Sequence, residues 1–162
     1  MSNYFEDLKV DAPVSLGSHV FGRDEIIDFA RKFDPQPFHL DEEAAHDGLF
    51  GGLAASGWHT SAIGLRLMID YRQREAALIS MCGERPARYG PSPGFEALKW
   101  LKPVLVDDTL TYSARVTQKA DSRSRPEIGL VFTQIEAVNQ RAELVFSVVT
   151  KVFVERRSRF AG

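Results

Sequence analysis

The chain has 162 residues, of which 44% are hydrophobic and 26% charged, and its net charge at pH 7 is −2. We expect one globular domain over residues 1–162, with its core over about 14–154. The small net charge gives no reason to expect a nucleic acid or an anionic membrane as partner, and no apolar run approaches the ~20 residues that span a bilayer. No signal-peptide pattern opens the chain and Cys82 is its only cysteine, so we expect a cytoplasmic location.

In the first half of the chain, short elements precede one long helix. Residues 11–22 predict an edge strand, and Asp24 is expected to cap the helix that follows. One face of that helix carries the apolar residues Ile26, Ile27, Ala30 and Phe33. Pro35 and Pro37 are expected to end the helix, since proline lacks a backbone donor and disfavours helix in the residue before it. Residues 41–46 predict a short helical turn with acidic residues at its start.

The longest predicted helix begins after Ser56, which is a natural N-cap. Its apolar positions are Trp58, Ala62, Ile63, Leu65, Leu67, Met68 and Ile69. A helix that is apolar over so much of its circumference is expected to be buried. Polar residues at 72–75 are expected to mark its exit to solvent.

The second half of the chain is rich in β-strand patterns. A loop with three prolines and three glycines is expected over 83–94. The predicted strands are 98–101, 109–117, 129–138 and 142–154, with turns at 121–126 and 139–140. Hairpin-spaced strands after a buried helix predict an α+β domain in which an antiparallel sheet wraps around that helix.

The segment from Asp34 to His39 carries the main candidate site. Because Pro35 and Pro37 prevent regular helix, this loop can present the Asp34 carboxylate and the His39 imidazole to one spot. The helix start at Gly57 can offer a backbone N–H to the same spot. An acid, a base and an oxyanion donor indicate proton transfer at a carbonyl compound. Each residue also has a structural interpretation: a turn at Asp34, a buried imidazole at His39 and close packing at Gly57.

Three sequence stretches resemble the MaoC-like dehydratases, which are (R)-specific enoyl-CoA hydratases with a hot-dog fold. They are Asp34-Pro35-Gln36-Pro37-Phe38-His39, the Ser56-Gly57 helix start, and residues 98–104 followed by Asp108-Thr109-Leu110. The resemblance runs from about Leu16 to Val154. It departs from the family at Gln36, where Asn is usual, and at Ser56, which replaces a common His.

The resemblance implies a single hot-dog domain and a role for each site residue. Asp34 would deprotonate water, His39 would exchange the Cα proton, and the Gly57 N–H would hold the thioester oxygen. Gln36, Ser56 and Trp58 are expected to contact the substrate, an acyl-CoA thioester. No metal or redox cofactor is implied, since coenzyme A is part of the substrate. The family also implies a homodimer, with higher assembly left open.

Two other functions remain open from the sequence. One is a non-catalytic acyl-thioester-binding domain. The other is a thioesterase or acyl-carrier-protein dehydratase, relatives that commonly use a carboxylate on the central helix. Residues 56–69 contain no Asp or Glu, which disfavours the second alternative.

Four further patterns carry weaker hypotheses. A metal could be held by His39, Asp41 and His46, although a fourth ligand is missing. Ser56 and His59 could form a nucleophile–base pair, but a cap is the simpler role for Ser56. Trp58 could belong to the core rather than to an acyl tunnel. The basic residues near the C-terminus could meet coenzyme A phosphates: Arg156, Arg157 and Arg159.

Overall fold

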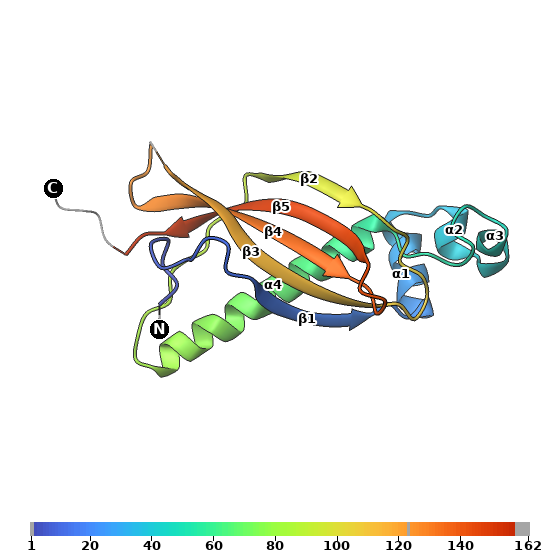
Figure 1. Cartoon of the computed structure of the whole chain (residues 1–162), viewed down its shortest axis with the longest axis horizontal. Helices are drawn as coiled ribbons and strands as arrows, with labels where there is room; N and C mark the ends of the chain where they lie inside the picture. The colour runs from blue at the N-terminus through green and yellow to red at the C-terminus, as the bar shows by residue number, and fades with distance from the viewer. Residues whose placement is uncertain (1, 123, 158–162) are drawn as a thin grey trace.

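The computed structural model describes residues 2–122 and 124–157, and over these it has one five-stranded antiparallel sheet and one long helix. The elements in chain order are β1 (Val14–Val20), α1 (Arg23–Phe33), α2 (Pro37–Leu40), α3 (Glu42–His46), α4 (Gly57–Met81), β2 (Gly94–Trp100), β3 (Thr109–Asp121), β4 (Ile128–Val138) and β5 (Leu144–Glu155). Figure 1 shows α4 running along one face of the curved sheet, with α1, α2 and α3 gathered where α4 begins. This is the α+β architecture that the sequence predicts.

The sheet has the strand order β1-β3-β4-β5-β2, so β1 and β2 are its edges. Strands β3, β4 and β5 are joined by hairpins, in which Thr111 pairs with Val138 and Ile128 with Glu155. The expected edge strand and hairpin strands are therefore confirmed. The strand expected at 98–101 begins earlier, at Gly94, because residues 94–96 also pair with β5.

Helix α1 ends at Phe33, as the prolines predict, but two details of the prediction are wrong. Its N-cap is Gly22 rather than Asp24, because the Glu25 carboxylate reaches back to accept the Gly22 N–H at 3.0 Å. Asp24 lies instead in the first turn, where the helix dipole favours a negative charge. Phe33 does not join the buried face and is 69% exposed. The last turn of α1 extends past the core, and Phe33 lies at the rim of the cavity described below.

Helix α4 begins after the predicted N-cap Ser56, whose Oγ accepts the Trp58 N–H at 3.2 Å. The helix does not end at 72–75 but continues to Met81, a length of 25 residues. Arg, Gln and Glu at 72–75 are strong helix formers, and the chain meets no helix breaker before Gly83, whose φ is +78°. None of the helices in the described ranges is long and apolar enough to cross a membrane.

The expectation that α4 is buried all round is wrong. The buried residues of α4 are His59, Thr60, Gly64, Met68 and Ile79. The sheet packs on the side that carries Gly64, through the Tyr112 and Phe146 rings, whereas His59 is covered by Phe29 of α1 and by Phe21. On the other side, Trp58 and Leu65 are 50% and 55% exposed. One chain therefore leaves an apolar face of α4 open.

Candidate active site

A cavity of about 420 Å³ lies at the end of the sheet where α4 begins. Its walls come from the segment between α1 and α4, from the first turn of α4, from the end of β2 and the loop after it, and from the start of β5. Figure 1 shows that the start of α4 lies at the same end of the molecule as α1, α2 and α3. The residues that line it are Phe33, Asp34, Gln36, Phe38, His39, Phe50, Ala54, Ala55, Gly57, Trp58, Thr60, Trp100, Lys102, Pro103, Val104 and Val145. The loop with two prolines and the start of the helix therefore meet at one cavity.

Asp34 directly follows α1, and two hydrogen bonds fix its carboxylate. The Ser56 hydroxyl donates to Oδ2 at 2.7 Å, and the Gln36 side-chain amide donates to Oδ1 at 2.7 Å. Partial burial raises the pKa of Asp34, but these two hydrogen bonds and the nearby His39 outweigh it, so the pKa lies below its usual value. Asp34 is therefore held as a charged carboxylate at neutral pH.

His39 lies on the one-turn helix α2 and is almost fully buried. Its Nδ1 is 2.7 Å from the carbonyl oxygen of Ala54. A carbonyl can only accept, so Nδ1 carries a proton, and Nε2 is the ring nitrogen left to exchange a proton with a bound molecule. Nε2 faces Asp34 Oδ2 at 3.4 Å. The two side chains thus form an acid–base pair on the cavity wall.

Gly57 is the first residue of α4 and lines the same cavity. Its backbone N–H lies at the positive end of a long helix and has no hydrogen-bond partner within the described part of the chain. A side chain is excluded here, because a Cβ on Gly57 would lie 2.5 Å from the Trp100 ring. The Trp100 indole N–H donates to the Ser61 hydroxyl at 3.2 Å, which fixes the ring over the helix start.

Comparisons with known proteins identify the family. Residues 6–138 match the model of the MaoC-like domain. The chain belongs to the MaoC-like family.

Relatives agree with this assignment over most of the chain. A MaoC-like dehydratase from Rhodospirillum rubrum is 38% identical, with a TM-score of 0.79, and the match covers 97% of this chain and 99% of that one. The uncharacterised protein YdeM of Bacillus subtilis (strain 168) is 31% identical over 83% of this chain and 86% of its own length. An (R)-hydratase from A. caviae involved in PHA biosynthesis shares the fold, with 24% identity, a TM-score of 0.61, and coverage of 91% of this chain and 97% of that one. The hot-dog fold expected from the sequence is therefore confirmed.

The residues at which this chain departs from the family pattern both contact Asp34. Gln36 lines the cavity, and its longer side chain folds back to the Asp34 carboxylate. Ser56 is fully buried and does not line the cavity; its single oxygen caps α4 and donates to Asp34. Trp58 lines the cavity and is half exposed, so it is not a core residue. Of the three expected substrate contacts, Gln36 and Trp58 are therefore placed to touch a ligand directly.

The hydrogen bond from Gln36 is expected to lower the pKa of Asp34, and this role can be tested through the pH dependence of kcat/KM. Gln36→Met removes one hydrogen bond to the Asp34 carboxylate from an exposed loop position. The pKa of Asp34 should then rise toward its usual value, so the acid limb of the kcat/KM profile should move to higher pH, with the plateau retained. Gln36→Asn, which keeps an amide on a shorter stem, should move the limb less. An acid limb that stays in place in Gln36→Met contradicts this role.

Neither a metal site at His39, Asp41 and His46 nor a nucleophile–base pair of Ser56 and His59 fits the geometry. No group of three His, Cys, Asp or Glu side chains is arranged to hold a metal anywhere in residues 2–122 and 124–157. Asp41 instead caps α3, accepting the Glu43 N–H at 2.9 Å. Ser56 bonds to Asp34 and to the helix backbone, whereas the His59 ring stacks on Phe29 with centroids 4.6 Å apart. Ser56 and His59 therefore do not form a nucleophile–base pair.

The C-terminal arginines lie at the other end of the sheet from the cavity (Figure 1). Arg156 pairs with Asp121, and Arg157 pairs with Asp7. Arg159 lies outside the described residues. Within one chain, the two described arginines are engaged with acidic side chains and do not reach the cavity.

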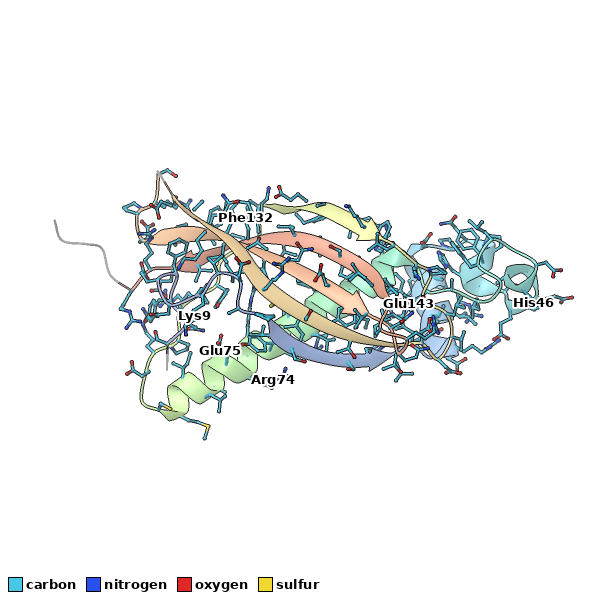
Figure 2. The ribbon with its side chains drawn as sticks, in the orientation of Figure 1. Lys9, His46, Arg74, Glu75, Phe132 and Glu143 are labelled. Carbon is cyan, nitrogen blue, oxygen red and sulfur yellow. The ribbon has the colours of Figure 1, made fainter. Side chains whose placement is uncertain are left out.

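Three cavity residues carry no signal in the sequence that points to a site. Trp100 sits in an ordinary strand pattern, and Phe50 in a glycine-rich loop. Lys102 follows β2 and pairs with Glu143 at 2.6 Å; Figure 2 shows Glu143 at the end of the sheet nearest α1. The folding of β2 back toward the start of α4 brings Trp100 and Lys102 to the cavity, whereas Phe50 reaches it from the loop between α3 and α4.

Proposed function

We propose that this protein is a hydratase/dehydratase that interconverts a trans-2-enoyl-CoA and an (R)-3-hydroxyacyl-CoA. The observation that carries the proposal is the pair of Asp34 Oδ2 and His39 Nε2, 3.4 Å apart, on a cavity that Gly57 also lines. The 38% identical relative described as a MaoC-like dehydratase supports the same reaction class.

The pair can supply both proton transfers of the reaction. The Asp34 carboxylate takes one proton from water as the water oxygen attacks C3, and protonated His39 gives its Nε2 proton to Cα. The C=C π electrons pass through an enolate to the new Cα–H bond. Asp34 is then protonated and His39 neutral, and one proton transfer across their 3.4 Å contact restores the pair. Because water is added without a change in net oxidation level, the reaction needs no redox cofactor.

The developing enolate oxygen can be held by the Gly57 N–H. That donor is preorganised by α4. The space that a side chain on Gly57 would fill is taken by the Trp100 ring, so the glycine lets this ring lie against the helix start beside the donor. A thioesterase that works with a carboxylate on the central helix lacks its base here. The first acid on α4 is Asp70, which pairs with Arg66 at 3.0 Å.

The test is the loss of enoyl absorbance when the protein is mixed with crotonyl-CoA, together with a measurement of free thiol. Hydration without thiol release supports the proposal. Thiol release makes the protein a thioesterase. Binding of crotonyl-CoA without either reaction leaves an acyl-thioester-binding domain, and both results contradict the proposed activity.

We also propose that the protein works as a homodimer in the cytoplasm. The open apolar side of α4 continues onto the edge strand β2, since Trp58 contacts Trp100 and Phe95 with ring centroids 5.1 and 6.5 Å apart. Contiguous exposed apolar surface and an unpaired strand edge are features that proteins cover. A second copy that pairs β2 with β2 and α4 with α4 covers both at once.

Leu65→Glu is expected to shift this dimer toward the monomer, because it places a charge in the middle of the exposed face of α4. Light scattering coupled to size-exclusion chromatography measures the mass. Val20→Glu is the matched control, since Val20 is 54% exposed on the opposite sheet edge. A wild-type protein that runs as a monomer refutes the dimer.

A further inference from the structure

Two separate cavities lie along α4. The first is the candidate active site at the start of the helix. The second, about 260 Å³, lies beside the later turns and is lined by Met68, Tyr71, Arg72 and Glu75 together with Lys9 and residues of β3 and β4. Figure 2 shows Lys9 and Glu75 in the half of the molecule that lies away from α1. The two cavities share no lining residue.

A layer of three residues, Gly64, Tyr112 and Phe146, lies between the two cavities. Along α4, Gly64 comes between Thr60, which lines the first cavity, and Met68, which lines the second. The Tyr112 and Phe146 side chains are 0% and 1% exposed and point from the sheet toward the helix. A Cβ built on Gly64 would lie 3.1 Å from the Tyr112 ring and 3.6 Å from the Phe146 ring, so the rings pack directly on the helix backbone. The Tyr112 hydroxyl also donates to the Thr60 carbonyl at 2.9 Å, which fixes its ring behind a residue of the active-site wall.

This layer limits the space for an acyl chain. With C3 at Asp34 and His39 and the thioester oxygen at Gly57, carbons beyond C3 must occupy the rest of the first cavity. Its deep wall is formed by buried residues: Ala55, Thr60, Val104 and Val145. A straight chain that continued along α4 would meet Tyr112. The volume of about 420 Å³ is also near the low end of ligand clefts, which span ~300–1,000 Å³.

We infer that the enzyme takes enoyl-CoA substrates with short acyl chains and excludes longer straight chains, because the layer of Gly64, Tyr112 and Phe146 closes the path along α4. This inference rests on the proposed hydratase function and adds its substrate class.

The first test compares wild-type kcat/KM for trans-2-enoyl-CoAs of four, six, eight and ten carbons. We expect the value to fall about 100-fold or more from four to ten carbons, since a single ill-fitting methylene can cost tenfold or more. Binding provides a readout that does not need turnover. Both tryptophans of the chain, Trp58 and Trp100, line the cavity, so their fluorescence should respond to butyryl-CoA and much less to decanoyl-CoA at equal concentration.

The second test removes the barrier. Tyr112→Leu should connect the two cavities and raise the ratio of ten-carbon to four-carbon kcat/KM about tenfold or more. Tyr112→Phe keeps the ring and should keep the wild-type ratio. Phe5→Leu, which trims a ring in the separate core cluster around Val131 and Val152, controls for lost stability and should also keep the ratio.

The outcomes separate the two proposals. Efficient hydration of the ten-carbon substrate by the wild type overturns the size limit and leaves the hydratase function intact. A Tyr112→Leu protein that folds but keeps the wild-type ratio overturns the role of the layer. Absence of both hydration and binding for every chain length overturns the hydratase function and the substrate class with it. If Tyr112→Leu does not fold, the wild-type profile alone decides.

Discussion

Replacing Asp34 by Asn is expected to lower kcat for enoyl-CoA hydration by about 10²- to 10⁴-fold, the range that a positioned general base supplies. The amide has the shape of the carboxylate but has no basic lone pair for the water proton. The fold should survive, because the Ser56 hydroxyl can still donate to the side-chain oxygen and the Gln36 amide can turn its own oxygen toward the new NH₂. Steady-state kinetics with crotonyl-CoA, beside a thermal melt, measures both effects.

Asp41→Asn is the matched control for this variant. Asp41 is an acid in the same segment, but it caps α3 through the N–H groups of Glu43 and Ala44 and does not line the cavity. Asparagine is an equally good cap, so stability and rate should both stay near the wild-type values. Hydration by Asp34→Asn at the wild-type rate would show that Asp34 is not the base.

Gly57→Ala keeps the backbone N–H but is expected to lower kcat about 100-fold, the cost of losing one oxyanion donor, because the donor is moved out of place. The new methyl group would lie 2.5 Å from the Trp100 ring, so either the ring or the helix start must move. A shifted helix start carries the Gly57 N–H away from the thioester oxygen. Kinetics with crotonyl-CoA measures the loss.

The double variant Gly57→Ala/Trp100→Ala, compared with Trp100→Ala alone, tests whether the clash with the ring causes this loss. Without the ring the methyl group has room, so the helix start and its N–H can return to their places. If displacement of the N–H causes the loss, the double variant should be no slower than Trp100→Ala. A double variant that stays about 100-fold slower than Trp100→Ala would contradict this explanation.

Local patterns were enough to predict most of the fold and the meeting of Asp34 with His39. Alternation predicted the strands of the sheet, and the two prolines predicted the break that releases Asp34 from α1. The Asp34–His39 proximity followed from the same break, because a short irregular segment can turn both side chains to one side.

Long-range contacts explain what sequence reasoning missed. Trp100 reaches Gly57 only because the edge strand β2 lies beside the first turn of α4, and no local pattern encodes that meeting. The exposure of Leu65 was missed for a related reason. An apolar helix face in the sequence does not reveal whether residues of the same chain or of another chain will pack on it. Here the sheet packs on the other side of α4 and leaves Leu65 exposed.

The Ser56 hydroxyl links two properties that most proteins adjust separately. One oxygen accepts the Trp58 N–H at the beginning of α4 and donates to the carboxylate of Asp34. A substitution that strengthens or weakens the helix start therefore also changes how readily Asp34 takes up a proton. A single substitution at Ser56 therefore changes both the stability of the helix start and the pH range in which Asp34 is charged.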